Sequence, residues 1–308
     1  MNQEKSIVSI IIPTYNRAHT LPRAIGSVLA QDYPHWELVI VDDGSTDNTT
    51  QVLAQYNDPR IKIVKHSQNR GVTAAENTGL DVMSGEWFTF LGSDDEIVPY
   101  ALQAMLQPLE FDPTINAITC NCTDSVTGRF SGLGLDCDQY LSFETMLQRC
   151  RGEHWGITKH ILLGDLRFNE QIPLEGILWT KISKNANRYY MHQGLRIYHT
   201  EGQDRISKPS VQRDLEKRRK LFTVLQNEKE YLEILRLHQP DTYTRMLFNL
   251  ALVSILDERR DDAMQAYREI KGKTSRARDL FIRSGLIFGS TWMKMAYRFA
   301  IGIQEKFI

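Results

Sequence analysis

Long apolar runs are missing from the sequence, and so are the cysteine patterns of disulfide-rich or zinc-binding proteins. No stretch of about 18 consecutive apolar residues occurs, so we expect no membrane-spanning helix. The run "IVSIII" ends at Pro13 and is too short for a signal peptide. The four cysteines lack the paired spacing of a typical zinc site, which favours reduced, partly buried thiols. The lack of long apolar runs and of disulfide or zinc cysteine patterns favours a cytoplasmic protein in a reducing compartment.

A strong charge of one sign is also missing. Lys and Arg total 37 against 38 for Asp and Glu, so no global field favours a nucleic acid partner. No glycine-rich dinucleotide fingerprint follows the first apolar run, which argues against a dehydrogenase. What the chain does have is a hydrophobic fraction of 42%, enough to build a sizeable core.

The first part of the chain alternates apolar runs typical of strands with segments of helical spacing. Strands and helices that alternate in this way indicate an α/β fold, in which a mostly parallel, right-handed sheet is flanked by helices. The predicted strands are 7–12, 36–41, 61–65, 87–91 and 115–121, and the predicted helices are 21–31, 47–56, 72–83 and 100–109.

The rest of the chain divides by composition. Residues 124–208 are rich in glycine, which predicts loops and a few added strands. Beyond Lys208 glycine and proline are scarce and apolar residues recur at helical spacing, so we expect a helical C-terminal region. It includes a helical hairpin in "YTRMLFNLALVSILDERRDDAMQAYREIKG" and a last helix from Ser275. We therefore predict two domains, 1–208 and 209–308.

Polar clusters follow three of the predicted strands, at 13–16, 42–47 and 92–95. Because parallel strands end at one edge of a sheet, the three clusters should converge there. Adjacent carboxylates such as Asp94 and Asp95 raise each other's pKa unless a cation lies between them. Oxygen ligands of this kind suit Mg²⁺ or Mn²⁺ that also binds a substrate diphosphate. The alternative is that these aspartates cap the next helix.

Two stretches carry a resemblance to a known family. "SIIIPTYNRAHTLPRAIGSVLAQDYPHWELVIVDDGSTDNT" and "NRGVTAAENTGLDVMSGEWFTFLGSDDEI" resemble the nucleotide-sugar-binding half of inverting family 2 glycosyltransferases, which have the GT-A fold. The resemblance is strong over about the first 110 residues and weak in the tail. It implies a nucleotide-sugar donor of the UDP type and a divalent metal cofactor.

The resemblance also implies roles for individual residues. Asp42 would accept the imide hydrogen of uracil, whereas Asp43 would order the turn. Asp94 would contact the ribose or the waters of the metal, and Asp95 would bind the metal itself. The remaining residues implied to bind the donor are Pro13, Thr14, Tyr15, Asn16, Arg70, Asn77 and Ser93.

The catalytic base is expected in the segment "NEQIPLEGILWTKI". An inverting enzyme needs a carboxylate that takes the proton of the acceptor hydroxyl, and the resemblance implies Glu175, with Glu170 in reserve. The alternative is that Glu175 only caps the following helix. This chain has Gly176 where the family has a second acid, Gly92 where many relatives have aspartate, and Glu76 where many have arginine.

A further segment, "IYHTEGQDRISK", resembles the part of the family that closes over the diphosphate. It implies His199 as a metal ligand and Arg205 as a phosphate contact. A lone histidine is, however, more often an ordinary structural residue.

The tail is basic and rich in apolar residues. From Arg259 to Ile308 there are 11 Lys or Arg and 5 Asp or Glu. A helix of this composition suits an anionic membrane surface, such as the inner face of the plasma membrane. It could equally pack on the catalytic domain or on a second copy of the chain in a homo-oligomer.

Two functions are consistent with these patterns. The first is a metal-dependent glycosyltransferase that extends a glycan or lipid-linked glycan acceptor from a UDP-linked donor. The second is a non-catalytic scaffold that keeps the nucleotide pocket. This alternative is motivated by the departures from the family pattern at Gly92, Glu76 and Gly176. Release of UDP from the donor distinguishes the two.

Overall fold

A computed structural model describes residues 6–172, 174–201 and 215–305 of the chain. The chain divides into two compact units, Met1–Gln203 and Asp204–Ile308. The domain boundary predicted after residue 208 falls outside the described residues.

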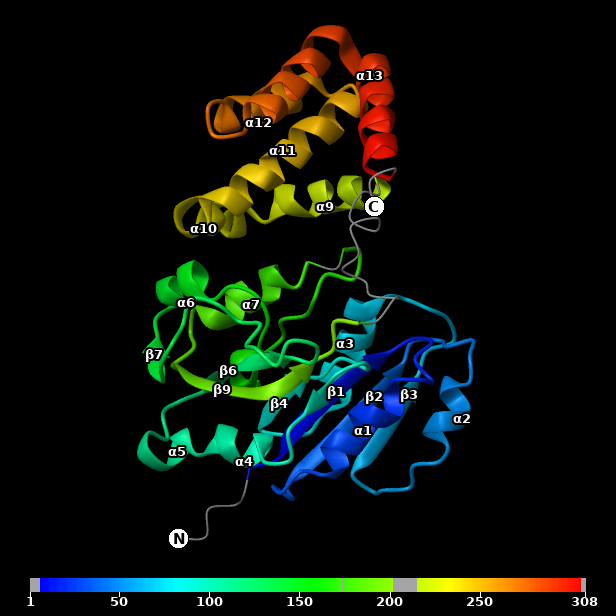
Figure 1. Cartoon of the computed structure of the whole chain (residues 1–308), viewed down its shortest axis with the longest axis vertical. Coiled ribbons are helices and arrows are strands. Elements are labelled where there is room, and N and C mark those ends of the chain that lie inside the picture. The colour runs from blue at the N-terminus through cyan, green and yellow to red at the C-terminus, as the bar shows by residue number, and fades with distance from the viewer. Residues whose placement is uncertain (1–5, 173, 202–214, 306–308) are drawn as a thin grey trace. The chain divides into compact units, whose positions relative to one another are not determined.

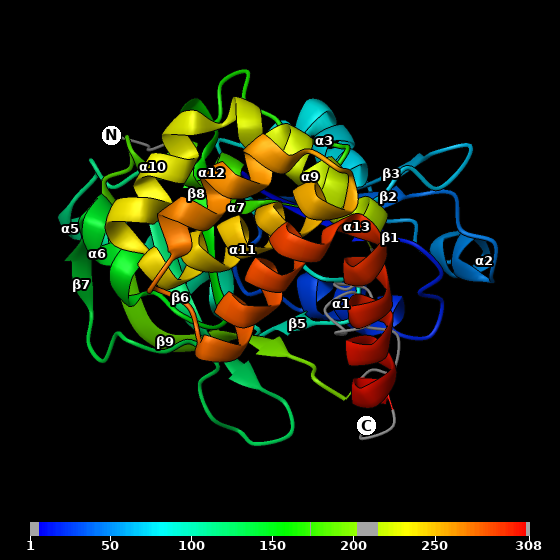
Figure 2. The ribbon, with the colours of Figure 1, turned by 90° about the horizontal axis from the view of Figure 1, so that it is seen from above.

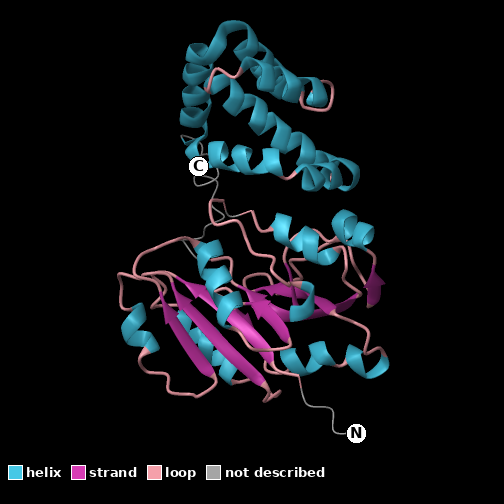
Figure 3. Cartoon of the chain, turned by 180° about the vertical axis from the view of Figure 1, so that it is seen from behind, coloured by secondary structure: helices cyan, strands magenta, loops and turns pink. Residues whose placement is uncertain are grey.

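The first unit is built on one continuous nine-stranded sheet (Figure 3). Its strand order is β3-β2-β1-β4-β8-β6-β9-β5, and β7 pairs with β9. β1 runs parallel to both β2 and β4, and β2 runs parallel to β3, whereas β8 is antiparallel to β4 and β6. The strands are β1 Val8–Thr14, β2 Trp36–Asp42, β3 Ile61–Lys65, β4 Trp87–Phe90, β5 Glu96–Ile97, β6 Ala117–Asp124, β7 Gln139–Leu141, β8 His154–Lys159 and β9 Arg188–Tyr198.

Helices cover both faces of this sheet (Figure 1). Alternate residues of β1 point to opposite faces, so Ile10 belongs to the core cluster that contains α1, and Ile11 belongs to the one that contains α3. α3 approaches β1 closely at Gly79, where a Cβ atom would lie 2.3 Å from Cγ2 of Ile11. The helices are α1 Leu21–Leu29, α2 Thr49–Leu53, α3 Val72–Val82, α4 Ala101–Leu106, α5 Pro108–Phe111, α6 Phe143–Arg149 and α7 Gly176–Ser183, with a 3₁₀ turn at His160–Leu162.

The predicted α/β class is confirmed, and the differences from the predicted elements are local. The helix expected at 100–109 is two helices, because Pro108, the first residue of α5, has no backbone N–H to continue the hydrogen bonds of α4. The added strands expected in the glycine-rich part are β7, β8 and β9. All four cysteines are free thiols.

The second unit is helical, as the sequence predicts. α11 packs against both α12 and α13 around a core that includes Leu252, Ala263 and Ile282 (Figure 2). Gly289 interrupts α13 with φ 82° and ψ −172°, a backbone conformation that only glycine adopts readily. No helix in the described part of the chain is long and apolar enough to span a bilayer. The helices are α9 Leu215–Asn227, α10 Lys229–His238, α11 Pro240–Leu256, α12 Arg260–Ile270 and α13 Arg276–Glu305.

Candidate active site

The carboxyl ends of the first strands lie side by side. β1 lies between β2 and β4, and all three run parallel, so the segments that follow them leave the same edge of the sheet. In the register of the sheet, Thr14 pairs with Asp42, and Asp42 pairs with Lys65. The convergence predicted for the polar segments therefore holds at the level of the backbone.

Asn16 joins the first polar segment to the second. Its side-chain Oδ1 accepts hydrogen bonds from the backbone N–H groups of Thr46, at 2.8 Å, and Asp47, at 3.3 Å. Its own backbone N–H donates to Oγ of Ser45 at 2.9 Å. Asn16 has φ 54°, a left-handed conformation that asparagine tolerates better than most residues. The side chain thus holds two loops together, and the predicted contact of Asn16 with a nucleoside stays a prediction.

Asp42 is fully buried at the end of β2. Its Oδ1 accepts a hydrogen bond from the Ser45 backbone at 2.9 Å, and its Oδ2 lies 3.7 Å from Nζ of Lys65. Beside it, the buried Oγ1 of Thr14 has no hydrogen-bond partner among the described residues. Pro13 precedes Thr14 in β1, and Tyr15 follows it with 39% of its surface exposed. Tyr15, Thr14 and Asp42 therefore lie at the ends of two adjacent strands, where the sequence predicts a nucleoside pocket.

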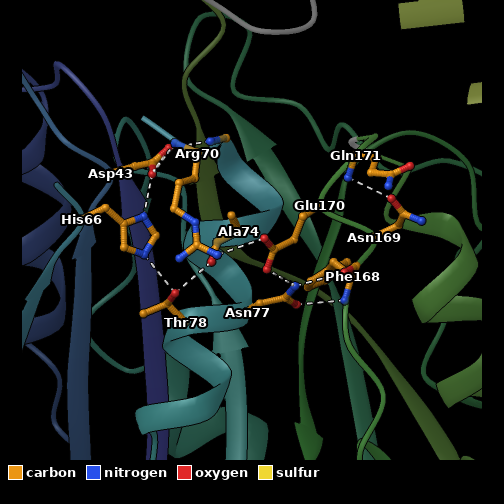
Figure 4. Close-up of polar contacts among 11 residues, drawn as sticks. Asp43, His66, Arg70, Ala74, Asn77, Thr78, Phe168, Asn169, Glu170 and Gln171 are labelled. Carbon is orange, nitrogen blue, oxygen red and sulfur yellow. Dashed lines mark hydrogen bonds and ion pairs between the residues drawn. The ribbon is translucent and has the colours of Figure 1, made fainter. Parts of the chain in front are cut away.

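Asp43 orders the loop that leads into α3 (Figure 4). Its Oδ1 accepts from the Arg70 backbone at 2.9 Å and lies 2.6 Å from Nδ1 of His66, and its Oδ2 accepts from the Gly71 backbone at 2.8 Å. The other ring nitrogen of His66 lies 2.9 Å from the hydroxyl of Thr78 on α3. The ordering role predicted for Asp43 is confirmed.

Arg70 and Asn77 both contact the segment that precedes α7 (Figure 4). Asn77 donates from Nδ2 to the carbonyl of Phe168 at 3.0 Å and accepts from the N–H of Phe168 at 2.8 Å. Nη2 of Arg70 lies 3.0 Å from Oε2 of Glu170, and Asn77 donates to Oε1 of the same carboxylate at 3.2 Å. Asn77 therefore satisfies the hydrogen-bonding groups of the Phe168 backbone, which is the alternative to a contact with the ligand. Glu170 forms an ion pair with Arg70.

The carboxylate of Asp95 is occupied by protein partners. Only 1% of the residue is exposed; its Oδ2 accepts from Nε of Arg196 at 3.1 Å, and its Oδ1 accepts from the backbone of His199 at 2.9 Å. The ring nitrogens of His199 lie 2.7 Å from Glu201 and 2.8 Å from Glu96. The predicted metal ligands Asp95 and His199 are thus brought together, but each uses its ligand atoms within the protein.

Asp94 is more open than Asp95. Burial and the charge on Asp95 raise the pKa of Asp94, whereas Arg17 and Arg196 lower it. The backbone of Arg17 donates to Oγ1 of Thr49, which follows the second polar segment. Arg17 therefore connects the second and third segments, which confirms that they lie close together.

Gly92 leaves room for both carboxyl groups. A Cβ atom at this position would lie 2.7 Å from Oδ2 of Asp95 and 3.0 Å from Oδ1 of Asp94. The aspartate that many relatives carry here would need both side chains to shift. Ser93, next to Gly92, is buried.

We tested whether the described residues fit a divalent cation. No group of three or more His, Cys, Asp or Glu among residues 6–172, 174–201 and 215–305 could hold a metal ion by itself. Mg²⁺ and Mn²⁺ are, however, often bound by one or two carboxylates together with substrate phosphates. Asp94 could be such a carboxylate ligand, because a nearby cation would offset the burial and repulsion that raise its pKa. Asp95 and His199 fit this role less well.

The candidate base Glu175 lies among other carboxyl groups. It directly precedes α7 but makes no side-chain hydrogen bond that caps the helix, so the capping alternative is not observed. Glu175 as a whole is exposed, yet the protein atoms around its carboxyl group raise its pKa, the charge on Glu153 raises it further, and Arg196 lowers it. A raised pKa makes the carboxylate a stronger base, which suits a group that accepts a proton during the reaction.

Sequence reasoning missed Arg196 and Glu153 as members of this site, and it noted Glu76 only as a departure from the family pattern. Arg196, Glu153 and Glu76 come from β9, the turn before β8, and α3. Arg196 is one of two arginines in β9, and no local pattern sets it apart from Arg188. Arg205 lies outside the described residues.

A mixed α/β sheet whose parallel strands end in polar segments, with carboxyl groups of raised pKa nearby, is typical of a protein that binds a polar ligand at this edge. The model of the family described as glycosyl transferase family 2 matches residues 9–158. Together with the curated relatives below, this shows that the chain belongs to glycosyltransferase family 2, and it is a glycosyltransferase.

Two curated relatives match about three fifths of the chain or more. The GalNAc(5)-diNAcBac-PP-undecaprenol beta-1,3-glucosyltransferase of Campylobacter jejuni is 34% identical over 209 residues, which cover 65% of this chain and 67% of the relative. The UDP-Glc:alpha-D-GlcNAc-diphosphoundecaprenol beta-1,3-glucosyltransferase WfgD of Escherichia coli is 31% identical over 186 residues, covering 59% of this chain and 71% of the relative.

Solved structures support the fold. The crystal structure of S. aureus TarS 1-349 in complex with UDP matches with a TM-score of 0.62 and 20% identity, over 95% of this chain and 91% of that one. The complex with UDP-GlcNAc matches with a TM-score of 0.64 and 19% identity, over 95% and 92%. At this identity the likeness shows the fold alone.

Proposed function

We propose that this chain transfers a sugar from a UDP-linked donor to a hydroxyl group of a glycan carried on a lipid diphosphate. The names of both curated relatives specify undecaprenyl diphosphate acceptors, and one specifies UDP-Glc as donor. The structural relative of the same fold binds UDP. The observation that carries the proposal is the convergence of Thr14, Asp42 and the segment around Asp94 at one edge of the sheet.

The donor site uses the ends of β1 and β2. Asp42 presents a buried carboxylate that can accept the imide hydrogen of uracil, and Tyr15 offers an aromatic face for the base. The free hydroxyl of Thr14 offers a further hydrogen bond, since a buried hydroxyl without a partner is costly. A bound nucleoside would therefore give the Thr14 hydroxyl a partner and the Asp42 carboxylate an additional donor.

Glu175 acts as the general base of an inverting displacement. The acceptor oxygen attacks the anomeric carbon while its proton moves to Glu175, and the bond to the UDP oxygen breaks with its electron pair leaving on the diphosphate. The raised pKa of Glu175 favours this transfer, because a stronger base accepts the proton more readily. Glu170 is a poorer candidate, since it pairs with Arg70 and Asn77.

A divalent cation, Mn²⁺ or Mg²⁺, is the proposed cofactor. Asp94 would hold it, with the donor diphosphate as the other source of oxygen ligands. When bound, the cation screens the charge that develops on the leaving diphosphate.

α13 is the proposed contact with the membrane that carries the acceptor. Four large apolar side chains of this helix are 61 to 69% exposed: Leu280, Ile287, Phe288 and Met295. The helix also carries Arg276, Arg278, Arg283 and Lys294. Apolar and basic residues on one helix suit the interface of an anionic bilayer, such as the inner face of the plasma membrane.

Release of UDP from UDP-glucose, with and without Mn²⁺, tests the proposal. We expect the wild type to release UDP slowly to water and faster with a lipid-diphosphate glycan, while Glu175→Gln still binds UDP but releases it at least about a hundredfold more slowly. Glu170→Gln is the matched control and should stay near the wild-type rate. Tight UDP binding without any turnover by the wild type would contradict catalysis and favour a scaffold.

A further inference from the structure

Glu76 is a buried carboxyl group without a compensating partner. It lies on α3, only 5% of the residue is exposed, and its Oε2 has no hydrogen-bond partner among the described residues. A charged carboxylate in such a place is strongly disfavoured unless a cation or several donors face it. The group is therefore held as the neutral acid.

Glu175 lies close enough to Glu76 for its charge to act on that carboxyl group. Burial, and then the negative charge on Glu175, raise the pKa of Glu76 to about 9. Glu175 in turn faces Glu153, which raises its pKa, and Arg196, which lowers it. The four groups come from α3, the residue before α7, the turn before β8, and β9.

α3 and the segment that leads to Glu175 are tied together. Asn77, the neighbour of Glu76 in sequence, makes two hydrogen bonds with the backbone of Phe168 (Figure 4). On the opposite side, α3 packs closely on β1 at Gly79. Glu76 is therefore held on a rigid element.

We propose that Glu76 is a positioning residue for Glu175: it keeps its proton, presents a neutral carboxyl group to the Glu175 carboxylate, and supplies from α3 the second acid that Gly176 does not provide. This inference rests on the proposed role of Glu175 as the base. If Glu76 keeps its proton, the pair carries one negative charge, and that charge resides on Glu175. Glu175 is then the member of the pair that accepts the proton of the acceptor hydroxyl.

Protein stability offers a test that needs no substrate. Folded Glu76 retains a proton that the unfolded chain releases above the ordinary glutamate pKa of 4.5, so the free energy of unfolding should fall as the pH rises from 4.5 to about 9. Glu76→Gln is neutral at every pH and escapes this loss. We expect equal melting temperatures for the wild type and Glu76→Gln at pH 5, and a melting temperature at least about 4 °C higher for the variant at pH 8.5.

The pairing with Glu175 is tested by the same measurement in a Glu175→Gln background. There the repulsion is gone, so the advantage of Glu76→Gln at pH 8.5 should be smaller. An equal advantage in both backgrounds, or no advantage in either, overturns the proposal. Glu76→Leu is also neutral and provides the same comparison if the Gln variant does not fold, and Glu170→Gln is the control for an exposed glutamate.

UDP release from UDP-glucose then tests the positioning role. We expect Glu76→Leu to lower kcat at least about tenfold with KM for the donor unchanged, and Glu76→Gln to stay within about threefold of the wild type, because its amide can still face Glu175. A Leu variant as fast as the wild type, beside an inactive Glu175→Gln, overturns the positioning role and leaves the proposed function intact. If the wild type itself releases no UDP, the proposed function fails, and the stability comparison still decides where the proton resides.

Discussion

Oδ2 of Asp95 lies 3.1 Å from Nε of Arg196, so the second of the two adjacent aspartates is an ion-pair partner inside the protein. Both groups are largely buried, and the other oxygen of Asp95 accepts from the backbone of His199. This pairing joins the turn after β4 to β9. It leaves Asp94, which is more open, as the carboxylate available to a ligand.

We therefore predict different effects for the two aspartates. Asp95→Asn removes the charge that balances Arg196 and should lower the free energy of unfolding by about 3 kcal/mol, seen as a lower melting temperature. Asp94→Asn should leave the melting temperature nearly unchanged and slow UDP release at least about tenfold. The reverse pattern, a stable but inactive Asp95→Asn and an active Asp94→Asn, would contradict this assignment.

Asp43 should matter for stability more than its exposed neighbours do. Asp43→Ala removes contacts with His66, Arg70 and Gly71, and at about 1 kcal/mol for each contact we expect a loss of about 3 kcal/mol in urea unfolding. Glu170→Ala breaks an exposed pair with Arg70 and one hydrogen bond from Asn77, and should cost only about 1 kcal/mol. Equal losses in the two variants would show that the loop before α3 does not depend on Asp43.

The pH dependence of turnover should follow Glu175. A general base works only when deprotonated, and the pKa of Glu175 is raised, so kcat should fall as the pH drops through that raised value. Glu153→Gln removes a negative charge near Glu175 and should move the acid limb of the profile to lower pH. A limb at the same pH in both proteins would mean that another group controls the rate.

The exposed side chains of α13 should control attachment to anionic vesicles. Replacing Ile287 and Phe288 with glutamate removes apolar area and adds negative charge, so flotation with phosphatidylglycerol vesicles should drop at least about tenfold. Leu237→Glu, on α10, changes an equally exposed leucine and should float like the wild type. If both variants float like the wild type, α13 is not the membrane contact.

Much of the first unit could be predicted from the sequence because its signals are local. Apolar runs such as 36–41 and 61–65 are short, punctuated by turns and separated by helical spacing, so the α/β order and the shared edge follow from general rules. The order of the helices in the second unit is predictable for the same reason. The role of Asp43 also follows from its place in a turn, where a carboxylate commonly binds nearby backbone N–H groups.

The rest of the site depends on contacts that no local pattern specifies. Asp95 and Arg196 are 101 residues apart and meet only because the turn after β4 lies against β9. In the sequence, Glu76 is simply one polar residue of a predicted helix. Its proximity to Glu175 depends on how the irregular segment before α7 packs on α3. Sequence periodicity indicates which face of α3 is buried, but not which group it meets there.

Calorimetric titration with UDP in the presence of Mn²⁺ tests the central claim most directly, because it asks whether the edge formed by β1, β2 and β4 binds the nucleotide. The account predicts that the wild type binds UDP and that Asp42→Asn binds it at least about tenfold more weakly through loss of the charged contact to the base. Asp112→Asn, which changes a partly exposed aspartate after α5, should bind UDP like the wild type. Equal affinity of the wild type and Asp42→Asn, or no heat of binding in any of the three proteins, would contradict it.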